Sequence, residues 1–267
     1  MLRFVYLFFA LAISVSLFAQ ATGQSQPQQQ QQPAYVEDGG TTEILQSIFI
    51  PPKAHAPFSL TLHTEWVKTL SDGNTITLMN QRHIYRDSQG RIFQERVVLV
   101  PKTGKYTPYV TTLQYADPKL HAVFNCFTNG RQQCVRLAYD ATPEMNFAPV
   151  SPKPGPLPDG MGNREHEDLG KQSIEGVETV GTRDRVTYNP GVFGNDAPMT
   201  VEHETWYSPQ LGINLLSIRT DPRLGKQTFR ATDISTSEPD ASLFLLPKGY
   251  KVVSPNRPEQ EPDTSEN

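Results

Sequence analysis

The chain lacks most of the features that mark a helical protein or a nucleic-acid-binding protein. It has 267 residues, with only two cysteines and two tryptophans. No useful length of it repeats apolar residues at the 3.6-residue period of an amphipathic helix, which excludes a helical bundle. Its 24 basic residues against 28 acidic ones leave no positive excess of the kind that holds nucleic acid or an anionic membrane by charge alone.

Recognised catalytic and cofactor motifs are also absent. The sequence contains no Gly-x-Ser-x-Gly, no Ser-x-x-Lys and no Gly-x-Gly-x-x-Gly, the patterns of common nucleophiles and of dinucleotide sites. The Gly-Lys pairs at Gly104, Gly170 and Gly225 lack the earlier glycine and the following Ser or Thr of a phosphate-binding loop. We therefore predict no cofactor and no enzymatic activity.

The only long apolar run lies at the N-terminus. Met1-Leu2-Arg3 precedes the apolar stretch Phe4–Phe18, and Ala19-Gln20-Ala21 follows with the small-x-small pattern of a signal-peptidase site. These features predict a signal peptide over 1–21. An uncleaved membrane anchor is the alternative, but it would need roughly 20 apolar residues. We expect an exported protein, periplasmic or extracellular, with no transmembrane segment after cleavage.

Both ends of the mature chain have the composition of disordered segments. Residues 22–40 are rich in Gln and Pro and predict a linker, and residues 254–267 form an acidic, Pro-containing tail. Apart from Ala34, Tyr35 and Val36, these segments have no apolar side chains with which to build a core. This leaves 41–253 as the expected single folded domain.

The two cysteines predict a disulfide. Cys126 and Cys134 bracket Asn129-Gly130, and Asn-Gly between two strand-like runs is a strong hairpin signal. A hairpin centred there sets the cysteines opposite each other, and an exported protein meets oxidising conditions. A redox-active pair is the functional alternative, but the Cys-x-x-Cys spacing is missing.

Short alternating segments predict a mainly β fold. In the first of them Phe58, Leu60, Leu62 and Trp66 alternate with polar residues, as expected for a strand with one buried face. The expected strands cover about 58–66, 75–85, 91–100, 109–115, 121–127, 133–139, 169–174, 177–188, 199–207, 213–220, 227–234 and 250–253. So many antiparallel strands twist into a curved sheet, so we predict a half-barrel.

Few other elements are expected. The only helix candidates are Thr42–Phe49 and a turn at Asp240–Leu245. Residues 141–163 are rich in Pro and Gly and predict a loop or crossover without regular structure.

Two polar clusters are candidate reactive sites. His166 lies in the charged run Arg164–Asp168, and Glu202, His203 and Glu204 alternate on one predicted strand. His166 lacks the second histidine of a zinc motif, so a solvated charge run is favoured and no metal is predicted. Two carboxylates on one strand face could serve a glycosidase, but cross-strand pairing with neighbouring arginines is the favoured interpretation.

Apolar strand faces supply a candidate ligand groove. Its residues come from the early and late strands: Phe58, Leu60, Leu62, Trp66, Trp206, Leu216, Ile218 and Phe229. Such faces are more often permanent core, and the groove is the functional alternative.

Particular segments carry a resemblance to known proteins. The stretches Thr69–Ile76, His83–Arg91, Ile174–Glu178, Trp206–Pro209 and Glu238–Phe244 resemble a group of exported proteins of acidobacteria and related soil bacteria that has no established activity.

The order of elements, with a Trp-containing strand before a Gly/Pro turn and then Asp240, Phe244 and Pro247, is also similar to the LolA–RseB-like superfamily of periplasmic lipoprotein carriers and anti-sigma regulators. That second resemblance implies a curved sheet that shelters acyl chains. No ligand-contacting residue of those carriers can be matched to this sequence, which also lacks their longer helices.

These observations favour a cell-envelope binding module. Its partner would be a hydrophobic ligand, such as a lipid or a lipoprotein acyl chain, or a segment of an envelope protein, and not a nucleic acid. Two alternatives stay open: an envelope hydrolase using Glu202 and Glu204 or His166, and a structural protein that associates through its sheet edges.

Overall fold

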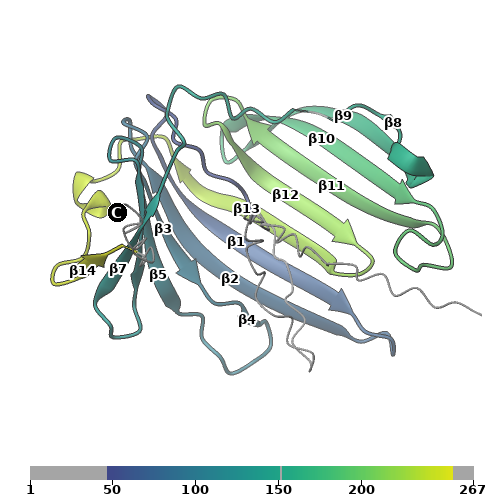
Figure 1. Ribbon diagram of the computed structural model, residues 1–267, viewed down its shortest axis with the longest axis horizontal. Coiled ribbons are helices and arrows are strands. Elements are labelled where there is room, and N and C mark those ends of the chain that lie inside the picture. Colours follow the sequence, from purple (N-terminus) through teal and green to yellow (C-terminus); the bar gives the residue numbers. More distant parts are fainter. Residues whose placement is uncertain (1–46, 151, 255–267) are drawn as a thin grey trace, which may run out of the picture. The chain divides into compact units, whose positions relative to one another are not determined.

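The computed structural model describes residues 47–150 and 152–254 (Figure 1). All of them belong to the second of two compact units of the chain, Glu43–Asn267. The described part of this unit forms one open, curved sheet of 14 strands, and the predicted fold class is confirmed. The predicted signal peptide 1–21, the linker 22–40 and nearly all of the tail 254–267 lie outside the described residues.

The strands follow one another with few interruptions. They are β1 (Phe58–Thr69), β2 (Thr75–Arg86), β3 (Ile92–Val97), β4 (Val100–Pro101), β5 (Val110–Asp117), β6 (Ala122–Phe127), β7 (Gln133–Ala138), β8 (Gly155–Pro156), β9 (Gly162–Ile174), β10 (Val177–Tyr188), β11 (Met199–Ser208), β12 (Ile213–Asp221), β13 (Gly225–Ser235) and β14 (Lys251–Val253). Two short 3₁₀ helices, η1 (Pro158–Gly160) and η2 (Ala241–Phe244), complete the described elements.

The sheet consists of two meanders joined along one seam. Its order is β14-β7-β6-β5-β3-β2-β1-β13-β12-β11-β10-β9-β8, with β4 beside β2. The seam is the antiparallel pairing of β1 with β13, elements far apart in sequence. One edge strand, β8, lies in the middle of the chain, and the other, β14, lies near its C-terminal end.

The connection between β7 and β8 requires the sheet to curve. These strands are separated by eleven inter-strand spacings, which in a flat sheet amount to roughly 53 Å. The chain from Ala138 to Gly155 could bridge that distance only if almost fully extended, at about 3.4 Å per residue. It contains a turn in which the Met145 N–H donates to the Thr142 carbonyl, so the sheet must bend between these two strands.

The sheet has two chemically different faces. Residues paired across antiparallel strands lie on the same face, and in β1 Phe58 and Leu62 alternate with Thr61 and His63. We call the face that carries Phe58 and Leu62 the Phe58 face, and the face that carries Thr61 and His63 the His63 face. Along β1 the Phe58 face is almost completely buried, as the alternation in the sequence predicts.

The main core lies on and around the Phe58 face. It includes Ile48, Ile50, Phe58, Leu60, Leu62, Ile84, Ile92, Leu215, Phe229 and Ala231. The segment before β1 is held to this face by Arg86, whose guanidinium donates to the carbonyl oxygens of Pro51 and Ala56.

A second core lies on the His63 face of β3, β5, β6 and β7. Phe93, Tyr115, Phe124 and the two cysteines form it. The segment containing η2 packs against it through Leu243, Phe244, Leu246 and Tyr250. The predicted turn at Asp240–Leu245 is therefore present as η2, where the Asp240 carboxylate accepts a hydrogen bond from the Ser242 N–H.

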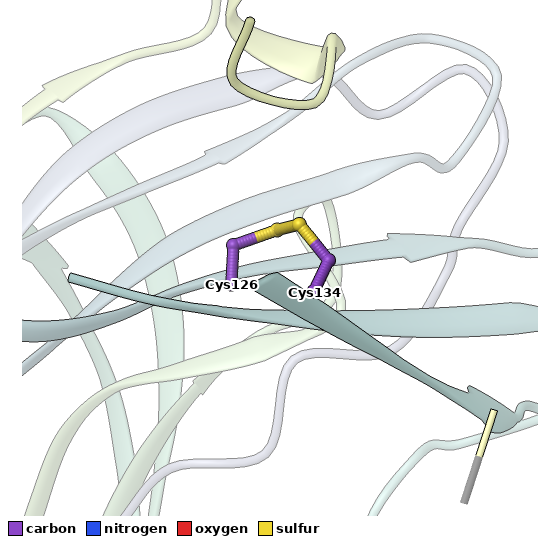
Figure 2. The surroundings of a disulfide bond; sticks show 2 residues. All are labelled: Cys126 and Cys134. Carbon is purple, nitrogen blue, oxygen red and sulfur yellow. A yellow bond between two sulfur atoms is a disulfide. The ribbon is translucent and has the colours of Figure 1, made fainter. Parts of the chain in front are cut away.

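The predicted disulfide is present. Cys126 and Cys134 are paired residues on β6 and β7, both fully buried, and Figure 2 shows the bond joining the two strands. A bridge that closes so short a loop contributes roughly 2–3 kcal/mol through the unfolded state.

Three sequence predictions need correction. The described part of the expected helix Thr42–Phe49, residues 47–49, is not helical; its side chains alternate between exposed and buried, the period of an extended segment. Residues 141–163 do form the crossover, but they also contain β8, η1 and the start of β9. The expected strand 91–100 ends at Val97, and Val100 instead pairs with β2.

Candidate functional site

The predicted groove residues are mostly packed core. Phe58, Leu60, Leu62, Leu216 and Phe229 are at most 5% exposed and share one cluster. Trp206 and Ile218 are partly buried against that cluster, and Trp66 is buried with its indole N–H donating to the Leu224 carbonyl at 2.6 Å.

The strand register also divides these residues between the two faces. Leu216 pairs with Arg230, which pairs with His63, so Leu216 lies on the His63 face and Phe58 does not. The eight side chains therefore do not line a single surface of the sheet. Strand alternation identifies the buried positions, but it does not show which strands share a face.

A cavity of about 170 Å³ lies next to this core on the Phe58 face. Its apolar lining comes from the segment before β1, from β3, β5 and β6, and from the residue that follows β7: Ile48, Phe49, Ile50, Ile92, Ala116, Val123 and Tyr139. Its polar lining consists of Gln94, Arg96 and Gln114. The cavity therefore presents an apolar side and a hydrogen-bonding side to whatever enters it.

The polar side is an ordered amide ladder. Gln94 donates to the side-chain oxygen of Gln114 at 2.7 Å, and Gln114 donates to Asn125 at 2.8 Å. Arg96 donates to the same Gln114 oxygen at 2.7 Å. These bonds fix the Arg96 guanidinium through a neutral group that does not balance its charge.

Arg82 lies beside Arg96 on the Phe58 face and is 6% exposed. Its guanidinium donates to the Ser47 hydroxyl at 2.6 Å, while its buried Nε has no hydrogen-bond partner. Burial, with Arg96 nearby, lowers the pKa of Arg82 to about 10, and burial lowers the pKa of Arg96. Both groups still carry a positive charge at neutral pH.

Two further cations on this side have a structural role. The fully buried Arg86 guanidinium is satisfied by carbonyl oxygens of Pro51, Ala56 and Leu211. Lys53 donates to the Pro209 and Gln210 carbonyls. Burial lowers the pKa of Arg86 to about 10, and burial together with Arg86 lowers the pKa of Lys53.

His166 lies within β9 and not at the start of a strand. Its Nδ1 is 2.7 Å from Oδ1 of Asp184, and its Nε2 is 3.4 Å from Asp168. The hydrogen bond with Asp184 raises the pKa of His166. Across the described ranges, no three His, Cys, Asp or Glu side chains gather closely enough to hold a metal ion.

Glu202 and Glu204 belong to the ion-pair ladder that the sequence predicts. On the His63 face Arg183 is 2.8 Å from Glu204, and Arg185 is 2.7 Å from Glu202. Burial raises the pKa of Glu204, but hydrogen bonds from Trp206 and Arg183 outweigh it and the pKa is lowered. A glycosidase acid needs the opposite shift, so this geometry does not suit acid–base catalysis.

One polar contact was missed in the sequence. His203 Nε2 lies 3.0 Å from the Ser217 hydroxyl on the neighbouring strand. Burial, together with Arg219, lowers the pKa of His203. The Asp184 carboxylate that could orient this histidine is hydrogen-bonded to His166 instead, so the arrangement of a catalytic triad is incomplete.

Comparisons with known proteins identify no family. No protein-family model and no curated protein sequence matches the chain. Among solved structures, the chain is similar to the Pseudomonas aeruginosa MucA/MucB complex, with 14% identity over 74% of this chain and 58% of that one and a TM-score of 0.35. It thus spans less than two thirds of the length of that chain.

Two smaller solved proteins are matched over more of their length. A LolA superfamily protein from Nitrosomonas europaea is 9% identical over 72% of this chain and 91% of that one, with a TM-score of 0.31. LprF from Mycobacterium bovis is 10% identical over 69% and 89%, with a TM-score of 0.26. With scores this low we draw no functional conclusion from the likeness, and the resemblance to acidobacterial proteins stays a prediction.

Proposed function

We propose that this protein is an exported, non-enzymatic binding module of the cell envelope that holds an amphiphilic ligand on the Phe58 face. The observation that carries the proposal is the cavity in which Ile92, Ala116 and Val123 lie beside an amide ladder on the same face of the sheet. Ligand sites are typically apolar clefts with a few well-placed polar groups. The packed residues around Phe58 provide the rigid wall for such a site.

The cavity size limits how much of a ligand it holds. At about 170 Å³ it is smaller than the roughly 300–1,000 Å³ of sites that enclose a whole small molecule. It therefore accommodates one end of an amphiphile, the polar group with the adjoining part of its chain. The remainder extends past Ile48 and Ile50, which form the other wall.

Association through sheet edges has less support. Among the described strands, the edges are β8, with two residues including Pro156, and β14, with three residues including Lys251. Very short edge strands that carry Pro or Lys are the means by which proteins prevent edge-to-edge pairing.

The proposal is tested by direct binding. The chain that follows Ala21 would be titrated calorimetrically with decanoate and with neutral monodecanoylglycerol, each below its micelle concentration. Ala116→Leu fills the cavity and should weaken binding of both by about tenfold. The exposed Ala138→Leu is the matched control and should bind normally. Failure of both amphiphiles to bind would remove the proposed function.

A further inference from the structure

We propose that Arg82 and Arg96 form an anion site that binds the carboxylate or phosphate group of the amphiphile. This inference rests on the proposed function, because the cavity lined by Arg96 would receive the ligand's apolar part. It adds the chemical class of the ligand: an amphiphile with an acidic head group.

The two arginines are neighbours on one face of the sheet. Arg82 on β2 and Arg96 on β3 both lie on the Phe58 face, as the strand register and the alternation of side chains along each strand require. They are close enough that the charge of Arg96 lowers the pKa of Arg82. Two like charges brought together under burial form a stable arrangement only when something of opposite sign offsets them.

No described acidic side chain supplies that opposite charge. Across residues 47–150 and 152–254, neither Arg82 nor Arg96 forms an ion pair with an Asp or Glu. Two arginines on β10 show the contrast: Arg183 pairs with Glu204, and Arg185 pairs with Glu202. Arg82 and Arg96 have no such acidic partner among the described residues.

The geometry suits an oxyanion. Guanidinium groups bind carboxylate and phosphate through parallel N–H donors, and they do so more strongly where water is excluded. Arg82 has a buried Nε without a partner, and Arg96 is held in position by Gln114. An oxyanion between them would accept from both side chains while the ligand's chain lies against Val123 and Ala116.

Matched amphiphiles test the site. We expect the chain that follows Ala21 to bind decanoate roughly tenfold or more tightly than monodecanoylglycerol, which has the same acyl chain. Arg96→Gln and Arg82→Gln should abolish this preference while monodecanoylglycerol still binds, which shows that the variants are folded. Arg96→Lys should retain part of the preference. The exposed Arg131→Gln is the control for loss of one charge and should keep all of it.

The outcomes separate the two proposals. Equal affinities in the unaltered chain, or a preference that survives Arg96→Gln, overturn the anion site and leave the binding module standing. If inorganic phosphate binds in an Arg96-dependent manner but neither amphiphile does, the anion site holds and the proposed function fails. No binding of phosphate or of either amphiphile overturns both.

A final arm asks whether the chain provides its own anion. Glu43 precedes Ser47, the hydrogen-bond partner of Arg82, by four residues. If Glu43→Gln lowers the free energy of unfolding as much as Arg82→Gln and the double variant loses no more, the carboxylate of Glu43 is the counter-ion and the proposal is overturned. Additive losses support an external anion.

Discussion

At the scale of single residues, the arginines of this sheet occupy three environments. Arg183 pairs with carboxylates on the His63 face, Arg86 is satisfied by backbone carbonyls, and Arg82 with Arg96 has neutral partners beside a cavity. These environments depend on which strands are neighbours. Alternation along β11 predicted that Glu202 and Glu204 pair with neighbouring arginines, but no pattern in the sequence indicates that Arg82 is buried and Arg96 half-buried.

Two histidines at this scale should give opposite pH dependences of stability. The pKa of His203 is lowered by burial and by Arg219, so its contribution is complete above the ordinary value of 6.5 and is lost as the pH falls below it. The pKa of His166 is raised, chiefly by its hydrogen bond with Asp184 and also by Asp168. Its contribution is complete below 6.5 and is lost as the pH rises through the raised pKa.

Urea unfolding between pH 5 and pH 8 checks both signs. His203→Gln should reduce the loss of stability on acidification. The variant has no buried imidazole whose protonation would favour the unfolded chain. His166→Gln should increase that loss, because the stabilising imidazolium is gone. Each variant is the control for the other, and a change in the same direction for both would contradict the assigned environments.

At the scale of elements, the close approach of Gly181 to Trp206 sets how β10 and β11 pair. The two residues are paired in the register, and a Cβ at Gly181 would lie 2.6 Å from the Trp206 ring. The ring is further fixed because its N–H donates to Glu204 at 2.8 Å. The indole therefore fills the space above the glycine.

Gly181→Ala should displace that ring. We expect a loss of about 1–3 kcal/mol in the free energy of unfolding, with a change in tryptophan fluorescence as the indole leaves Glu204. In a Trp206→Ala background the same substitution should cost much less, since the clash is absent. Costs that simply add in the double variant would show that the ring does not limit this position.

The elements were largely predictable, and the exceptions have physical causes. The alternation of apolar and polar residues predicted β1 and β2, and the Asn129-Gly130 turn signal predicted the hairpin of β6 and β7. The first half of β9 was missed because Asn163–Asp168 is polar on both sides, and its alternation in exposure leaves no apolar pattern to detect. The expected helix at 42–49 reflected composition, while Ile48 and Ile50 follow strand periodicity.

At the scale of the whole described unit, the decisive contact joins β1 to β13. Local signals predict each hairpin, but this pairing between distant segments follows only from assembly of the complete sheet. The same pairing decides which residues share a face, and so it separates Leu216 from Phe58. The candidate site escaped prediction for another reason: its residues come from β2, β3, β5, β6 and the segment before β1, and the sequence does not show that this segment packs on these strands.

The C-terminal segment should prevent self-association. Leu243, Phe244, Leu246 and Tyr250 cover the second core, and β14 pairs in parallel with β7, which would otherwise be an edge strand. Removal of residues 240–267 exposes both the apolar surface and the edge. We expect the free energy of unfolding to fall by roughly 2–5 kcal/mol, with dye binding to exposed apolar surface and self-association measured by light scattering.

A shorter truncation separates this role from that of the acidic tail. Removal of residues 255–267 retains β14 and every side chain that packs on the second core, so stability and particle size should match those of the intact chain. Both truncations keep Glu238, whose carboxylate accepts hydrogen bonds from Ser88, so loss of that contact does not enter the comparison. If the longer truncation stays monomeric and equally stable, η2 and β14 do not protect the sheet. Exposure of the surface they cover would then have no cost in stability.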